Sequence, residues 1–342
     1  MAASGPPARS RATLSGISSR AWEHPADRGA LVALRKLKGF DALLKTMSGF
    51  LNERRVRLLF LGSGVRVDER QFTELHRLLL DVAHVLDVDE IPEMYVVADP
   101  YLNAVTIGLD KPIIVLNSAL VDLLDAEELR FVIGHELGHA VSGHAIYRTM
   151  LLWLLQFSTV LASIPAGGLA ARGIIAALQE WARKSELSAD RAGLLATQDP
   201  ATAYRVHMQL ASGGHLEDLD PTAFFAQGQE YENTENIRDS VLKLLITEQR
   251  SHPFAVVRAS ELRRWVDSGE YAASVGGAYP RRSDDADAKL SDAAKEAAKS
   301  YTEAFSQTGD MLGKLVHDAA GWLGSAKLWI DEQLRRRGDA DA

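Results

Sequence analysis

Two histidines in the middle of the chain have the spacing of a pair of metal ligands. Residues 135–139 read His-Glu-Leu-Gly-His. Residues four apart on a helix share one face, so the imidazoles of His135 and His139 can reach the same cation. Glu136 lies about a third of a turn away, near the open position of that cation. A carboxylate there can act on metal-bound water, so the pattern predicts a hydrolytic metal centre.

The chain must supply a third ligand without sulfur. A catalytic zinc ion needs three protein ligands and one open position, and the sequence contains no cysteine. Glu186 and Asp190 are again four residues apart; Glu186 can bind the metal while Asp190 accepts a hydrogen bond from a ligand histidine's other ring nitrogen. His144 follows His139 by five residues, and on a continuous helix its side chain would point too far from His135 and His139 to bind the same metal ion. It either contacts the ligands from outside the site or lies on the surface.

The elements that must position these residues are mostly helices. Asp125 is a good N-cap and Glu128 completes a capping box, which predicts that a helix begins there and carries residues 135–139. Turn signals around 99–100 and 110–112 separate short strand-like runs, which favours a small, mostly antiparallel sheet. Helical spacing marks 31–44 and 72–86, and strand-like runs occupy 56–61, 95–98, 103–108 and 113–116.

Four motifs occur in the order found in one protease family. Asn103-Ala104, the run from His135 to His144, the Glu186–Asp190 pair and Ser251-His252-Pro253 together resemble the HtpX-like zinc metallopeptidases, which include the CAAX prenyl proteases. The similarity spans about residues 56–265. It implies a predominantly helical α+β, zincin-like fold with a small antiparallel sheet, an active-site helix carrying HExxH, and one Zn²⁺ ion per subunit.

The resemblance also implies a role for each motif residue. It makes His135, His139 and Glu186 the zinc ligands, Glu136 the catalytic base and Asp190 the carboxylate that holds a ligand histidine. The strand edge at Asn103, Ala104 and Val105 would bind a polypeptide substrate as an added strand. His252 would either stabilise the oxyanion or cap a loop.

Charge is distributed unevenly along the chain. The net charge of −8 argues against a general nucleic-acid binder, which needs a basic face. Residues 1–57 nevertheless hold eleven Lys and Arg against four Asp and Glu, which leaves −15 for the remainder. This basic segment can lie on an anionic membrane or on the acidic body of the protein. No signal peptide is visible, so we expect a cytoplasmic protein that can be peripheral to the inner face of the cell membrane.

Three parts follow from these patterns. Residues 1–55 form a basic segment that is poorly ordered over 1–20 and then helical, 56–270 form the peptidase domain, and 271–342 form a linker and an amphipathic helical tail. Residues 149–171 carry no charge. Because His139 and Glu186 must bind one ion on one side of any membrane, we expect a helical hairpin there that is buried, shallowly inserted or covering the active-site cleft. The tail helix at 311–334 packs on the body or a second subunit, or lies on a membrane.

The function predicted from these residues is that of a zinc metalloendopeptidase in intracellular or membrane-associated protein quality control. The alternative is a chaperone-like or peptide-binding module that keeps zinc for structure alone. Glu136 counts against that alternative, since a structural zinc site has no use for a general base. A third hypothesis is zinc-dependent hydrolysis of a substrate other than a peptide.

Overall fold

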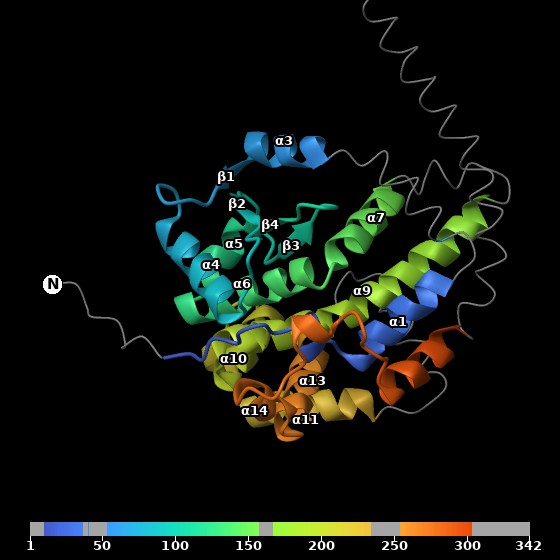
Figure 1. Cartoon of the computed structure of the whole chain (residues 1–342). Coiled ribbons are helices and arrows are strands. Elements are labelled where there is room, and N and C mark those ends of the chain that lie inside the picture. Colours follow the sequence, from blue (N-terminus) through green and yellow to red (C-terminus); the bar gives the residue numbers. More distant parts are fainter. Residues whose placement is uncertain (1–9, 37–39, 41–52, 157–166, 234–253, 303–342) are drawn as a thin grey trace, which may run out of the picture.

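Helices surround a small four-stranded sheet in the computed structural model, which describes residues 10–36, 40, 53–156, 167–233 and 254–302 (Figure 1). The strands are β1 (Gly64–Arg66), β2 (Glu93–Val97), β3 (Ala104–Ile107) and β4 (Ile113–Asn117). The helices are α1 (Pro25–Lys36), α3 (Glu53–Ser63), α4 (Thr73–Val85), α5 (Ser118–Leu123), α6 (Ala126–Val141), α7 (His144–Gln156), α9 (Gly167–Thr197), α10 (Pro200–Ser212), α11 (Pro221–Glu232), α13 (Ala255–Asp267) and α14 (Glu270–Val275). Short 3-10 turns lie at Ser19–Ala21, Leu216–Asp218 and Arg282–Asp284, and residues 292–302 are helical.

The sheet is mixed: two of its three strand pairings are antiparallel, as predicted, and the third is parallel. Its strand order is β1-β2-β4-β3. β1 and β3 are antiparallel to their neighbours, but the central pair, β2 and β4, is parallel. The chain leaves β2, forms β3 at the far side and returns between the two, so β4 runs in the same direction as β2. Among the described strands β3 therefore lies at an edge.

Residues 56–61 lie in helix α3, so the prediction of a strand there was wrong. Val56 and Phe60 are four residues apart and share one helical face. That face packs on the sheet side formed by Tyr95, Ile113 and Val115. A short apolar run cannot by itself distinguish a strand from a helix that covers a sheet.

The main core lies on the opposite face of the sheet. Side chains alternate between faces along a strand, so Met94 and Val96 of β2 point away from α3 and into a core formed with α4, α6, α9 and α10. Helix α6 crosses this core and begins as predicted. The Asp125 carboxylate accepts hydrogen bonds from the backbone N–H groups of Glu127 and Glu128, and the Glu128 carboxylate accepts one from the Asp125 N–H.

Helices α6 and α9 approach each other closely because glycines line their contact. A Cβ atom added to Gly138 would lie 2.5 Å from Ala192 Cβ, and one added to Gly134 would lie 2.5 Å from Ala196 Cβ. Ordinary contacts between carbon atoms are about 3.5–4.0 Å. Any larger residue at either glycine would therefore separate the two helices.

The described part of the N-terminal segment belongs to the folded body, which corrects the prediction that residues 1–20 are poorly ordered as a whole. Leu14 and Ile17 are buried in the main core. The Leu14 N–H donates to Val85 O over 2.8 Å, and the Ser18 N–H donates to Pro280 O over 2.9 Å. The segment thus joins α4 to a region near the other end of the chain.

Helix α1 packs against α7 and α9 in a second core (Figure 1). This core takes in buried apolar residues of α7 and of the first half of α9, including Met150, Leu154, Leu178 and Trp181. The uncharged stretch 149–171 is thus divided between the end of α7 and the beginning of α9, and residues 157–166 lie outside the described part. No helix in the described ranges combines the length and apolar character needed to cross a membrane. The predicted tail helix at 311–334 also lies outside those ranges.

Candidate metal centre

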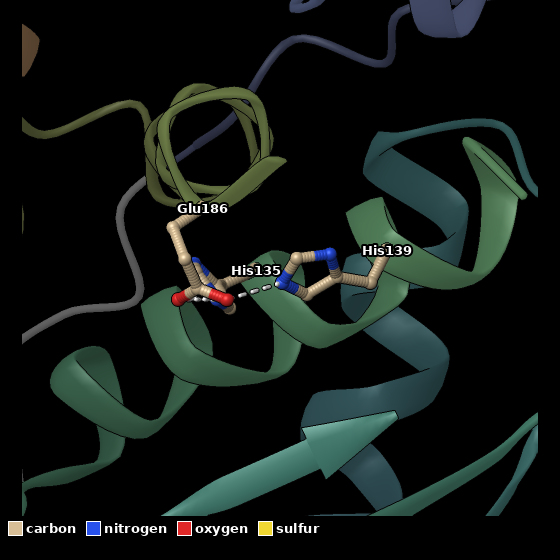
Figure 2. A group of neighbouring side chains, drawn as sticks. All are labelled: His135, His139 and Glu186. Carbon is tan, nitrogen blue, oxygen red and sulfur yellow. Dashed lines mark ion pairs between the residues drawn. The ribbon is translucent and has the colours of Figure 1, made fainter. Parts of the chain in front are cut away.

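His135 and His139 of α6 and Glu186 of α9 converge on one point (Figure 2). One ligand atom from each lies within 4.8 Å of the other two. Glu186 Oε2 is 3.5 Å from His135 Nε2, and Glu186 Oε1 is 3.3 Å from His139 Nε2. All three side chains are buried, and the close approach of α6 and α9 brings the carboxylate to the imidazoles.

This donor set fits a metal ion of the zinc type. Two imidazole nitrogens and one carboxylate oxygen are the ligands of a well-known class of catalytic zinc site, which leaves a fourth position open. Bonds of about 2.0–2.1 Å to a tetrahedral ion place neighbouring ligand atoms about 3.4 Å apart. The nitrogen–oxygen separations of 3.3 and 3.5 Å involve different oxygens of the Glu186 carboxylate, so each histidine has one carboxylate oxygen near the separation that such an ion requires.

Asp190 contacts the ring nitrogen of His135 that points away from the ligand cluster. Asp190 Oδ1 is 3.0 Å from His135 Nδ1, so the other ring nitrogen faces the ligand cluster. Arg258 of α13 clamps the carboxylate, with Nε 2.8 Å from Oδ2 and Nη2 2.6 Å from Oδ1. Burial would raise the pKa of Asp190, but the Arg258 guanidinium outweighs it and holds that pKa well below its usual value. Burial likewise would lower the pKa of His135, but Asp190 and Glu186 raise it to about 9.

Glu136 lies beside the ligand cluster and outside it. Its Oε2 accepts a 2.6 Å hydrogen bond from Thr106 Oγ1 of β3, and its Oε1 is 3.9 Å from His135 Nε2. The side chain is buried yet lines the cavity next to the ligands. Thr106 could not be predicted from the sequence as a partner of this carboxylate, because a lone threonine in a strand carries no distinguishing signal.

Arg148 of α7 is a second residue that sequence reasoning missed. Its Nη1 lies 2.7 Å from His139 Nε2, and the same nitrogen pairs with Glu186 Oε1. Burial and this guanidinium lower the pKa of His139 well below its usual value, so its imidazole is neutral. Arg148 follows His144 by four residues on α7, a spacing that could have indicated a shared helix face.

His144 contacts a ligand rather than solvent, which settles the two alternatives left by the sequence. It is buried, and its Nδ1 lies 3.0 Å from Nδ1 of His139. Gly143, with φ of +70°, lies between the end of α6 and the start of α7. His144 therefore belongs to a new helix, and the rotation expected for a continuous helix does not apply to it.

A cavity of about 700 Å³ opens onto the ligand cluster. Asn103 and Ala104 contribute to its wall, next to His135 and Glu136. Val105 does not line it, because alternation along β3 directs this side chain to the opposite face of the sheet, against Tyr95 and its neighbours. His252 lies outside the described residues, so its predicted role stays a prediction.

The ligand geometry and fold define a class of protein. Two histidines one helical turn apart, a glutamate from a neighbouring helix and a further carboxylate beside the open position are the arrangement of HExxH metallopeptidases. The family model of Peptidase family M48 matches residues 69–266, and the chain belongs to that family. The resemblance to HtpX-like proteases is thereby confirmed, and the chain is a metalloendopeptidase.

Named relatives agree with this assignment. The chain is 34% identical over 265 residues to the plastoglobule-localized metallopeptidase 48, chloroplastic, of Arabidopsis thaliana, covering 73% of each protein. It is 38% identical over 85 residues to a protease HtpX homolog of Helicobacter pylori, covering 24% of this chain and 27% of that one. It is 29% identical over 116 residues to the human mitochondrial metalloendopeptidase OMA1, covering 30% and 22%. No solved structure matches the chain.

Proposed function

We propose that this metalloendopeptidase uses zinc, held by His135, His139 and Glu186, and that Glu136 is its general base. The observation that carries the proposal is the convergence of the three ligand atoms with a separate carboxylate beside them. A zinc ion held there would lower the pKa of a water molecule and polarise the scissile carbonyl group.

In this proposal Glu136 moves the proton. Its side chain lines the cavity, and the Thr106 hydroxyl fixes one carboxylate oxygen while the other faces the ligand cluster. Glu136 would accept a proton from the attacking water and pass it to the nitrogen of the leaving amine. Proton transfer by a positioned side chain contributes about 10²- to 10⁴-fold to the rate.

A polypeptide in extended form is the substrate that the cavity favours. β3 is an edge strand whose neighbour Asn103 and first residue Ala104 line the cavity, so a substrate backbone can add to the sheet there. Such pairing uses main-chain groups and accepts many sequences. It supports a role in the quality control of unfolded or membrane-derived polypeptides.

Peripheral contact with an anionic membrane is part of the same proposal. α3 exposes Leu58, Leu59 and Leu61 together with the basic side chains of Arg54 and Arg55. A helix with exposed leucines and arginines can lie at a lipid interface. Cosedimentation with vesicles of anionic lipid, but not with neutral vesicles, is the expected result, and equal recovery in the supernatant with both would contradict it.

The substitution Glu136→Gln tests the proposed chemistry. We expect cleavage of an unfolded protein such as casein to fall by at least 10²-fold while metal analysis still finds one zinc ion per chain. A chelator should abolish the activity of the unchanged protein. An active Glu136→Gln variant would refute the role of Glu136. If instead the protein bound zinc, prevented aggregation and never cleaved, the chaperone-like alternative would be favoured.

A further inference from the structure

We propose that Asp27 positions the metal ligand His139 through a hydrogen-bond relay that passes across His144. Asp27 belongs to α1 and lies outside residues 69–266, the part of the chain matched by the family model. The inference rests on the proposed metal site and adds a residue from the N-terminal segment to it.

Three side chains from three different helices form the relay. His139 Nδ1 of α6 lies 3.0 Å from His144 Nδ1 of α7. His144 Nε2 lies 3.1 Å from Asp27 Oδ2 of α1. All three are at most 2% exposed, so water cannot replace any of these contacts. His139 presents its other nitrogen, Nε2, to Glu186 and the metal position.

The direction of each hydrogen bond follows from Arg148, which can only donate. Arg148 Nη1 lies 2.7 Å from His139 Nε2, so this nitrogen must carry the lone pair. The neutral His139 ring then carries its proton on Nδ1 and donates to Nδ1 of His144. His144 in turn carries its proton on Nε2 and donates to the Asp27 carboxylate. A metal ion on His139 Nε2 would replace the Arg148 donor there, and it needs the same tautomer because it binds the same lone pair.

The far end of the relay is itself fixed. Ser188 Oγ donates to Asp27 Oδ2 over 2.6 Å, and the backbone N–H of His24 donates to Ser188 Oγ over 2.8 Å. Ser188 lies on α9, two residues after Glu186. Helix α9, which carries Glu186, thus also holds the carboxylate that orients His139.

Burial of Asp27 is costly, which indicates that the carboxylate has a use. Its Oδ1 is buried and has no hydrogen-bond partner among the described residues. A buried unsatisfied polar atom costs about 1–3 kcal/mol. Its place in the first turn of α1 offsets part of this cost through the helix dipole. A small apolar residue would avoid the cost altogether but could not accept the proton of His144.

In this proposal a carboxylate orients each of the two histidine ligands, directly for His135 and through one intermediate residue for His139. His135 donates directly to Asp190, whereas His139 reaches its carboxylate through one intervening imidazole. Partners of this kind fix the tautomer and the ring orientation, and their loss commonly weakens metal binding by about 10- to 100-fold.

Zinc affinity is the direct test, measured by competition with a chromophoric chelator. We expect Asp27→Ala to weaken zinc binding by about 10- to 100-fold, and Asp27→Asn to weaken it less because an amide oxygen can still accept from His144. Tyr147→Phe is the matched control. It removes the hydrogen bonds that Arg35 of α1 donates to the Tyr147 hydroxyl of α7, at 2.9 and 2.6 Å, but leaves the relay intact. Its zinc affinity should be unchanged.

Two results would overturn the relay. One is unchanged zinc affinity in Asp27→Ala; the other is an equal loss in Asp27→Ala and Tyr147→Phe, which would show that α1 packing alone matters. If Asp27→Ala does not fold, ¹⁵N NMR spectra of the histidine rings in the unchanged, zinc-loaded protein test the relay instead. They should show His144 protonated on Nε2 only, and a proton on its Nδ1 instead would refute the assignment. Failure of the proposed metal site looks different, since the unchanged protein would then bind no zinc, and failure of the proposed catalysis would leave these zinc affinities unaffected.

Discussion

The substitution Gly138→Ala should separate α6 from α9 and weaken metal binding, although it adds only one methyl group. Its Cβ would lie 2.5 Å from Ala192 Cβ. Since ordinary carbon contacts are about 3.5–4.0 Å, the helices must move apart locally by about 1 Å. Metal–ligand distances tolerate about 0.2 Å. Glu186 lies on α9 fewer than two turns from Ala192, so the movement reaches the ligand.

The higher helix propensity of alanine favours the Gly138→Ala variant, whereas the clash with Ala192 disfavours it. The sign of the change in stability therefore shows which of the two is larger. Alanine in place of glycine inside a helix stabilises it by about 0.5–1 kcal/mol. Overpacking of a tight interface costs about 1–3 kcal/mol. We therefore expect a lower melting temperature in the metal-free protein and a zinc dissociation constant raised at least tenfold. Chelator competition measures the second and thermal unfolding the first.

A size-swapped double variant provides the decisive comparison. Gly138→Ala combined with Ala192→Gly moves the methyl group from one helix to the other and should restore most of the zinc affinity. Gly62→Ala on α3 is the matched single control, because no heavy atom lies within 4 Å of its added Cβ. Normal zinc binding by Gly138→Ala would contradict this effect of helix separation. So would a double variant that binds zinc no more tightly than Gly138→Ala alone.

Three further results are expected. Because Asp190 and Glu186 raise the pKa of His135 to about 9, zinc must displace a proton, and the apparent zinc affinity from chelator competition should rise about tenfold per pH unit up to pH 9. Burial lowers the pKa of His207 to about 4, so the folded state binds fewer protons than the unfolded one below pH 6.5. This histidine should contribute about 3 kcal/mol to the stability that the metal-free protein loses between pH 6.5 and 4, and His207→Leu should reduce the total loss by that amount in denaturant titrations. Asp125→Ala removes the capping box of α6 and should cost about 1 kcal/mol in the free energy of unfolding; an unchanged melting temperature would contradict this.

Local sequence rules could predict the centre of this site because one helix sets its geometry. The capping box at Asp125 fixed where α6 begins, and the spacing of His135 and His139 follows from the helical repeat. The same rule placed Glu186 and Asp190 on one face of α9. Relations of this kind depend on spacings of three or four residues, which are visible without knowledge of the tertiary structure.

Contacts between distant segments could not be predicted in this way. Asp27 and His144 are separated by more than a hundred residues, and no spacing rule connects them. The parallel pairing of β2 with β4 depends on where β3 is placed, and short apolar runs do not encode that choice. The run at Val56 was mistaken for a strand because covering a sheet and joining it demand the same apolar residues.

The contacts of residues 12–27 determine when the protein can finish folding. These residues leave the ribosome well before their partners, which lie far along the chain. The Ala12 N–H donates to Gln198, and the Ser18 hydroxyl donates to Asp285, a separation of 267 residues. Bonds with such long sequence separation form late. A nascent chain therefore holds the peptidase region without its full N-terminal contacts until residue 285 has been synthesised, so the hydrolytic centre should not reach its final stability before that point.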